Sequence, residues 1–93
     1  MEFEWDPEKG AKNLAKHGVA FDVVFGLDWA TGPILDDDRF DYREARYILY
    51  GRSSTGARYV VAFTLRTGIY RIISVRPFGR KEWRLYGDGE NDS

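Results

Sequence analysis

The sequence RYVVAFTLRTGIYRIISV, residues 58–75, decides the fold class of this chain. It contains two runs, 58–66 and 69–75, that alternate in polarity and are rich in β-branched and aromatic residues, which favour strands. Thr67-Gly68 between the runs has the composition of a tight hairpin turn. The stretch therefore predicts two antiparallel strands joined by a short turn.

The same signals extend this hairpin toward the N-terminus. Residues 46–52 form a third run of strand composition, and the polar stretch 53–56, which ends in glycine, is typical of a hairpin loop. These three runs predict an antiparallel meander. Short strands are also expected at residues 3–5 and at Ile34-Leu35, and Pro77 is expected to end the pairing of the last strand.

Helix signals flank the predicted meander. Asp6 and Pro7 have the residue types of a helix cap and a first helical position, and Gly18 can close a helix that runs to about Lys16. A second, short helix is expected over residues 22–27, because apolar residues recur there at helical spacing. Residues 80–86 are expected to form one or two helical turns.

Together these elements predict an α+β fold in which N-terminal helices pack on a small antiparallel β-sheet and a short helix follows. A chain of 93 residues has room for one domain. We expect that domain to span residues 1–86 and to be followed by an acidic, disordered tail at residues 87–93.

The composition excludes several classes of protein. Without cysteine the chain has neither disulfides nor thiolate metal ligands. No stretch approaches the roughly 18 apolar residues of a membrane span, and the first residues lack the basic end and apolar run of a signal peptide. We therefore expect a cytoplasmic protein without contact to a membrane.

The net charge of −1 conceals two opposed blocks. Residues 1–45 contain five basic and eleven acidic side chains, whereas residues 46–86 contain nine basic side chains and one acidic one. Eight of those nine are arginines, whose planar guanidinium suits phosphate. The second block predicts a surface that faces a polyanion.

Several fragments, in matching order and spacing over residues 3–86, resemble the BrnT toxins. The resembling residues are Phe3-Glu4-Trp5-Asp6-Pro7-Glu8-Lys9, Asn13-Leu14-Ala15-Lys16-His17-Gly18-Val19 with Phe21, Asp37-Asp38-Arg39, Gly51-Arg52-Ser53, Arg71-Ile72-Ile73-Ser74-Val75-Arg76, and Arg80-Lys81-Glu82. The chain departs from the family pattern at Pro77-Phe78-Gly79, Trp83 and Leu85, which leaves the exact role of Arg80 open.

This resemblance implies the toxin of a type II toxin-antitoxin pair, with a RelE-like fold and a ribonuclease activity that suppresses translation. It also implies a BrnA-like antitoxin that wraps the toxin and carries the DNA-binding part, so that operator DNA is bound only through the antitoxin. No cofactor is expected. A homodimer within the complex stays open, since Trp83 and Tyr86 offer surface for self-association.

Metal-independent RNA cleavage requires proton transfer and stabilisation of negative charge on the phosphorus. His17 has the one side chain with an ordinary pKa near neutrality, which makes it a candidate proton carrier, although it and Lys16 also suit a helix C-terminus. The candidate catalytic residues are Lys16, His17, Arg52, Arg76 and Arg80. The candidate RNA-binding residues are Arg66, Arg71, Lys81 and Tyr50.

Strand parity adds a conditional expectation. Without a bulge, Ile69, Arg71, Ile73 and Val75 share one face of their strand, and Tyr70, Ile72, Ser74 and Arg76 share the other. The aspartates at positions 36–38 and 41 have the residue type of a magnesium site, but consecutive carboxylates in a loop point in different directions. We expect a solvated loop there and no metal site.

Two other functions fit the residues. A non-catalytic binding module would use the basic strands to dock an acidic partner, and a degenerate toxin would keep the fold without the activity. RNA cleavage in the presence of EDTA distinguishes both from a nuclease.

Overall fold

The computed structural model describes residues 1–39 and 41–87. Its elements are, in order, β1 (Glu2–Glu4), α1 (Pro7–His17), the 3-10 helix η1 (Phe21–Gly26), β2 (Ile34–Asp36), β3 (Tyr47–Arg52), β4 (Arg58–Arg66), β5 (Ile69–Pro77) and α2 (Arg80–Tyr86). The predicted disordered tail lies, from residue 88 onward, outside the described residues. Within the described part, no helix is long and apolar enough to cross a membrane.

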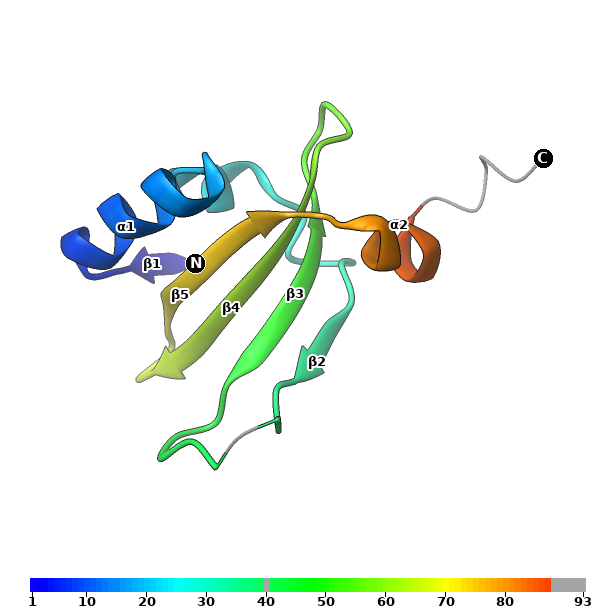
Figure 1. Cartoon of the computed structure of the whole chain (residues 1–93). Coiled ribbons are helices and arrows are strands. Elements are labelled where there is room, and N and C mark those ends of the chain that lie inside the picture. Colours follow the sequence, from blue (N-terminus) through cyan, green and yellow to red (C-terminus); the bar gives the residue numbers. More distant parts are fainter. Residues whose placement is uncertain (40, 88–93) are drawn as a thin grey trace.

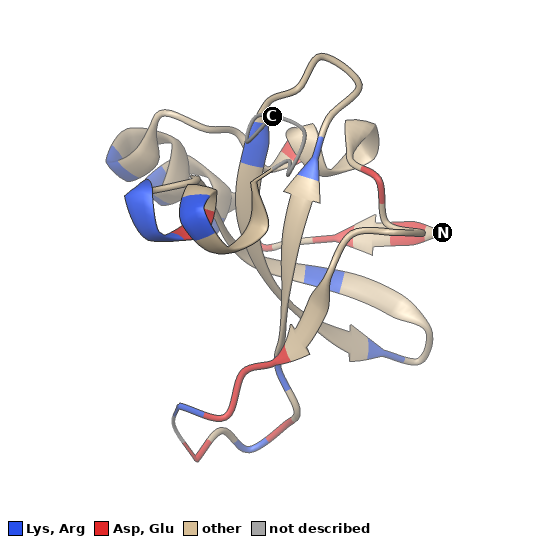
Figure 2. Cartoon of the chain, turned by 90° about the vertical axis from the view of Figure 1, so that its right-hand side faces the viewer, with Lys and Arg blue, Asp and Glu red and all other residues tan. Residues whose placement is uncertain are grey.

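The strands form one twisted sheet in the order β1-β5-β4-β3-β2 (Figures 1 and 2). The meander β3-β4-β5 is antiparallel, as predicted, and β2 pairs antiparallel with β3. β1 pairs in parallel with β5, so the sheet is mixed and not purely antiparallel. Most of the chain lies between β1 and β5. A connection of this length allows β1 to pair with β5 in either the parallel or the antiparallel direction. The α+β prediction is confirmed.

α1 begins and ends where its capping residues predict. The Asp6 carboxylate accepts a hydrogen bond from the Glu8 N–H at 2.9 Å, and Pro7 occupies the first turn. Gly18 ends the helix with a φ of 72°, a left-handed conformation that glycine adopts without a Cβ clash. The expected short second helix is present, but as a 3-10 helix that begins at Phe21.

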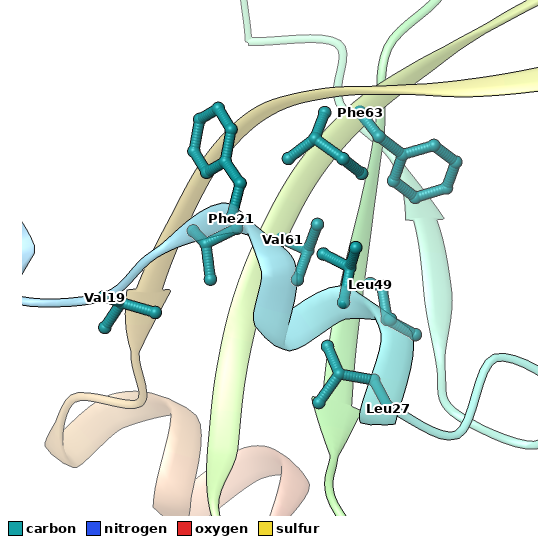
Figure 3. Close-up of a cluster of buried hydrophobic side chains, with 9 residues drawn as sticks. Val19, Phe21, Leu27, Leu49, Val61 and Phe63 are labelled. Atoms are coloured by element: carbon teal, nitrogen blue, oxygen red, sulfur yellow. The ribbon is translucent and has the colours of Figure 1, made fainter. Parts of the chain in front are cut away.

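The core lies between η1 and one face of the sheet (Figure 3). η1 contributes Phe21 and Val24 from its buried side. The indole of Trp29 packs against Phe63 and donates to the Val24 carbonyl at 2.9 Å, which satisfies its polar group inside an apolar cluster. The buried residues of this cluster are Val19, Phe21, Val24, Leu27, Leu49, Val61, Phe63, Ile72 and Val75.

Asn13 of α1 completes the edge of β5 beyond the end of β1. β1 pairs with β5 only as far as Arg71. Further along, the buried Asn13 amide donates to the carbonyls of Val75 and Val19 at 2.8 and 2.9 Å, and its carbonyl accepts from the Val75 N–H at 3.1 Å. The side chain thus replaces the bonds of a missing strand and fixes the rotation of α1 against the sheet.

A β-bulge in β5 removes the condition on which the parity expectation depended. Ala62 pairs with Ser74 and Phe63 pairs with Ile72, so Ile73 is an extra residue on β5. As a result Ile72 and Val75 both lie in the core. Ser74 and Arg76 lie on the opposite face, where they line a cleft.

β5 also runs two residues further than expected, through Pro77, which pairs with Tyr59. The N–H of Phe78 donates to the Arg58 carbonyl of β4 at 3.1 Å. Since successive N–H groups alternate in direction along a strand, the nitrogen of Pro77 points away from β4 to the open edge. The missing donor of proline therefore costs no bond of the β4–β5 ladder.

Candidate functional site

A cleft of about 430 Å³ lies on the sheet face opposite the core, between α2 and the segment that follows β2. The register places Tyr50, Val60 and Arg76 beside one another across β3, β4 and β5, and the bulge turns Ser74 toward the same face. The lining residues are Leu35, Asp36, Asp37, Asp38, Arg39, Ile48, Tyr50, Val60, Ala62, Ser74, Arg76, Lys81, Glu82, Leu85 and Tyr86. The cleft therefore combines three cations, four carboxylates, two tyrosine rings and a floor of apolar side chains.

Arg76 is oriented by Glu82 of α2. Two guanidinium nitrogens of Arg76 donate to the two carboxylate oxygens of Glu82 at 3.0 and 3.1 Å. Glu82 also accepts from the Gly79 N–H at 2.6 Å, which caps the helix. The bonds from Arg76 and from the Gly79 N–H lower the pKa of Glu82 to about 2. Glu82 is therefore ionised at neutral pH and is a weak base.

An aromatic wall closes one side of the cleft. The rings of Tyr50 and Tyr86 stack with centroids 3.9 Å apart and an angle of 19° between their planes. Burial raises the pKa of Tyr50, so its phenol remains protonated at neutral pH. Behind this wall the buried Arg58 donates to the Tyr86 carbonyl at 2.9 Å and lies over the Trp83 ring.

The sequence reading missed Arg58. The alternation of side chains along a strand puts Arg58 on the same face as Val60 and Ala62, so any element that covers this face also covers Arg58. The sequence does not show that α2 folds back onto β4 and buries the Arg58 guanidinium.

The opposite side of the cleft is acidic, and one of its aspartates is buried. Asp37 accepts from two nitrogens of Arg39 at 2.8 and 3.0 Å and from the Tyr42 hydroxyl at 3.2 Å. The Arg39 guanidinium lowers the pKa of Asp37. The expectation of a solvated loop is wrong for this residue, because the pair with Arg39 stabilises its burial, whereas Asp36 and Asp38 are exposed.

Three of the nine predicted site residues, Arg76, Lys81 and Tyr50, line this cleft together. Lys16 and His17 line a separate hollow of about 220 Å³. We call it the α1 hollow; its lining residues are Lys9, Lys12, Asn13, Lys16, His17, Ile73 and Ser74. Ser74 belongs to both sites, so the α1 hollow adjoins the cleft.

The remaining predicted site residues lie elsewhere. Arg52 lines hollows beside Asp28, one of which it shares with Tyr50 and Tyr86. Arg80 is the exposed first residue of α2. Arg66 and Arg71 lie toward the β4–β5 turn, where each pairs with a glutamate: Arg66 with Glu44 at 2.8 and 3.2 Å and Arg71 with Glu4 at 2.9 Å. The structure thus does not bring these four into the cleft.

The distribution of charge on the folded chain differs from its distribution along the sequence. Arg66, Arg71 and Arg76 of the basic block are each paired with a glutamate. The cations without a carboxylate in ion-pair range, among residues 1–39 and 41–87, include Lys9, Lys12 and Lys16 of α1 and Arg80, Lys81 and Arg84 of α2. Figure 2 shows the basic α2 and the acidic segment after β2 from the side of α2.

Comparison with known proteins agrees with this architecture. The family model described as "Ribonuclease toxin, BrnT, of type II toxin-antitoxin system" matches residues 5–82. The crystal structure of the Brucella abortus ribonuclease toxin BrnT superposes with a TM-score of 0.58 at 21% identity, covering 86% of this chain and 99% of that one. A comparison with curated protein sequences finds no significant match.

The family match places the chain among the ribonuclease toxins of type II toxin-antitoxin systems. Within that class it belongs to the BrnT family, and the structural match shows the same fold. The family resemblance read from the sequence is confirmed. Membership of a type II system implies in general an RNA substrate and an antitoxin partner.

Proposed function

We propose that the chain is a metal-independent endoribonuclease that cleaves single-stranded or ribosome-presented RNA and thereby inhibits translation. In the proposed reaction a ribose 2′-oxygen attacks the adjacent phosphorus. The O2′–P bond forms while the P–O5′ bond breaks. The 2′-hydroxyl proton goes to a base, the 5′-oxygen takes up a proton, and the products carry a 2′,3′-cyclic phosphate and a 5′-hydroxyl.

The observation that carries this proposal is that Arg76 and Lys81 line the same cleft. The pair with Glu82 holds the guanidinium in one orientation before any substrate binds. A positioned cation stabilises the charge that develops on the phosphorane more than the charge of the ground state. Arg76 is thus proposed as the principal catalytic residue, Lys81 as a phosphate contact and Glu82 as a positioning residue.

The aromatic wall supports the choice of an unpaired nucleotide as ligand. An RNA base that is not paired exposes its ring faces, and tyrosine rings stack on such faces. Tyr50 of β3 pairs with Val60 of β4, and Val60 pairs with Arg76 of β5, so the three residues lie side by side across the sheet. We propose that a base packs against the Tyr50–Tyr86 wall while Arg76 contacts its phosphate.

The proton transfers need a group other than Glu82, whose pKa of about 2 makes it a weak base. We propose His17 as the proton carrier and Lys16 as its neighbouring phosphate contact, since the hollow that they line adjoins the cleft at Ser74. Arg52 and Arg80, which lie outside the cleft, are proposed as contacts to flanking phosphates.

We further propose that residues 1–86 act as one cytoplasmic domain that a BrnA-like antitoxin neutralises by covering the cleft. Exposed apolar side chains beside the cleft, Leu35 and Leu85, support a protein partner there. In this proposal operator DNA is bound only through the antitoxin.

The test uses the full chain freed from its antitoxin. We expect it to cleave a single-stranded RNA in the presence of EDTA and to leave 2′,3′-cyclic phosphate ends. The same oligonucleotide with 2′-O-methyl groups at every position should remain intact, because the attacking hydroxyl is blocked. RNA binding without cleavage would instead favour the non-catalytic module, and cleavage that EDTA abolishes would contradict the metal-independent reaction.

A further inference from the structure

The second basic site of the molecule is the α1 hollow. We propose that it binds backbone phosphates of single-stranded RNA outside the cleft, so that the RNA runs from α1 across Ser74 to Arg76. The inference rests on the proposed function for the identity of the ligand. It adds Lys9 and Lys12 as binding residues that do not take part in the chemistry.

The geometry of α1 gathers the lysines at this hollow. Lys9, Lys12 and Lys16 are spaced i, i+3 and i+7, which places them along one side of the helix. Asn13 lies among them, buried, and its bonds to Val75 lock the helix rotation. The lysines therefore line the hollow against β5 and do not face solvent in arbitrary directions.

The charge of the hollow is uncompensated. None of these three lysines has a carboxylate in ion-pair range within the described residues, and the hollow itself is lined by no acidic side chain. Arg66, Arg71 and Arg76, in contrast, each have a glutamate in ion-pair range. A lysine ammonium with three donors binds phosphate oxygens as a point charge.

The bulge in β5 connects the two sites. The extra residue Ile73 and its neighbour Ser74 both line the α1 hollow, and Ser74 also lines the cleft. A small hydroxyl side chain between two groups of cations presents no bulky or acidic barrier to a polyanion. If one phosphate of an RNA contacts Arg76, the nucleotides that follow it on one side therefore reach the lysines of α1.

The experiment measures RNA affinity against salt concentration with a probe that the chain cannot cleave. The probe is a 2′-O-methyl RNA of roughly 12 nucleotides and mixed sequence, within the usual range of single-strand site sizes. The test variant is Lys9→Gln/Lys12→Gln. The control variant, Arg43→Gln/Arg84→Gln, removes two positive charges from exposed positions that line neither the cleft nor the α1 hollow.

Each phosphate contact to a single strand contributes about 0.7 to the slope of log K against log salt. We expect the slope of the α1 variant to fall by about 1.4 relative to wild type, with roughly tenfold weaker binding at low salt, while the control stays close to wild type. Binding of a dinucleotide, which fits the cleft alone, should not change. Equal weakening of test and control would overturn the inference, as would an unchanged slope.

The outcomes separate this inference from the proposed function. If the wild-type chain cleaves RNA but Lys9→Gln/Lys12→Gln binds the long probe with wild-type affinity, the α1 site is excluded and the nuclease proposal stands. If the wild-type chain cleaves no RNA but its binding of the long probe depends on Lys9 and Lys12, the nuclease proposal is excluded and the α1 site stands.

Discussion

Arg76 and Glu82 form a two-bonded ion pair, with N–O distances of 3.0 and 3.1 Å, that ties the end of β5 to the first turn of α2. The same carboxylate caps α2 through the Gly79 N–H. One residue therefore fixes both the helix that borders the cleft and the guanidinium within it. Any change at Glu82 should alter stability and the orientation of Arg76 together.

This pair gives stability a predictable dependence on pH. The pKa of Glu82 is about 2 in the folded chain, below its ordinary value of 4.5, so the unfolded chain binds the proton more tightly. The stabilisation is complete above pH 4.5 and is lost as the pH falls toward 2. Glu82→Gln should lower the free energy of unfolding by about 1 kcal/mol at pH 7, since Arg76 is 41% exposed.

Urea denaturation at pH 7 and at pH 3 measures the effect. The difference between wild type and Glu82→Gln should shrink at pH 3, because Glu82 of the unfolded wild-type chain then binds a proton that the folded chain, with its pKa of about 2, mostly does not. A difference that is the same at both values would show that the charge of Glu82 is irrelevant and that only its shape matters.

Arg76 and Arg66 provide a matched pair for activity. Both are partly exposed arginines of the meander with a bidentate glutamate partner, but Arg76 lies in the cleft and Arg66 lies toward the β4–β5 turn. Arg76→Ala should reduce the rate of RNA cleavage by about a hundredfold or more, the scale of losing one positioned group that stabilises the transition state.

Arg66→Ala should cleave at nearly the wild-type rate. Circular dichroism must show that both variants fold. A large loss of cleavage activity in Arg66→Ala would show that Arg66 belongs to the active site, as the sequence predicts, and that the site extends beyond the cleft. Full activity in Arg76→Ala would show that Arg76 is not part of the active site.

Asn13 should be among the most sensitive positions for stability. Asn13→Ala removes three hydrogen bonds and leaves the N–H and C=O of Val75 and the carbonyl of Val19 without this partner. Losing bonds to buried backbone groups should lower the free energy of unfolding by about 2–4 kcal/mol. Leu14→Ala, at a half-exposed neighbouring position, serves as the control and should cost less than about 1 kcal/mol. Chemical denaturation that gives equal losses would contradict the role of Asn13 at the β5 edge.

The fold was readable from sequence wherever a local signal decides it. The cap at Asp6, the closing glycine at position 18 and the turn at Thr67-Gly68 depend on neighbouring residues alone, and each appears in the structure as expected. The bulge at Ile73 and the parallel pairing of β1 depend on contacts between distant segments. No periodicity within one strand reveals either.

The site was readable only in part for a similar reason. A count of charges marked residues 46–86 as the polyanion surface, but folding brings Glu4 to Arg71 and Glu44 to Arg66. The lysines of α1, from the acidic half of the sequence, keep their charge uncompensated within the described residues. Long-range ion pairs thus change which cations remain to bind a phosphate.

Tyr50 allows the proposed base stacking to be tested apart from hydrogen bonding. Its ring stacks on Tyr86 at 3.9 Å, and its phenol stays protonated at neutral pH because burial raises its pKa. Tyr50→Phe keeps the ring and should bind the uncleavable 2′-O-methyl RNA with nearly wild-type affinity. Tyr50→Ala removes the ring and should weaken binding by about 1–3 kcal/mol, the range for one base stacked on an aromatic side chain.

Tyr50→Ala also disturbs the wall itself, since Tyr86 loses its stacking partner. Tyr86→Ala is therefore measured in parallel: if the base stacks on Tyr50, this variant should lose less affinity than Tyr50→Ala, because the ring of Tyr50 remains in the cleft. Fluorescence anisotropy of the labelled RNA gives all three affinities. Equal weakening in Tyr50→Phe and Tyr50→Ala would show that the hydroxyl makes the contact, and wild-type affinity in Tyr50→Ala would exclude Tyr50 from the RNA site.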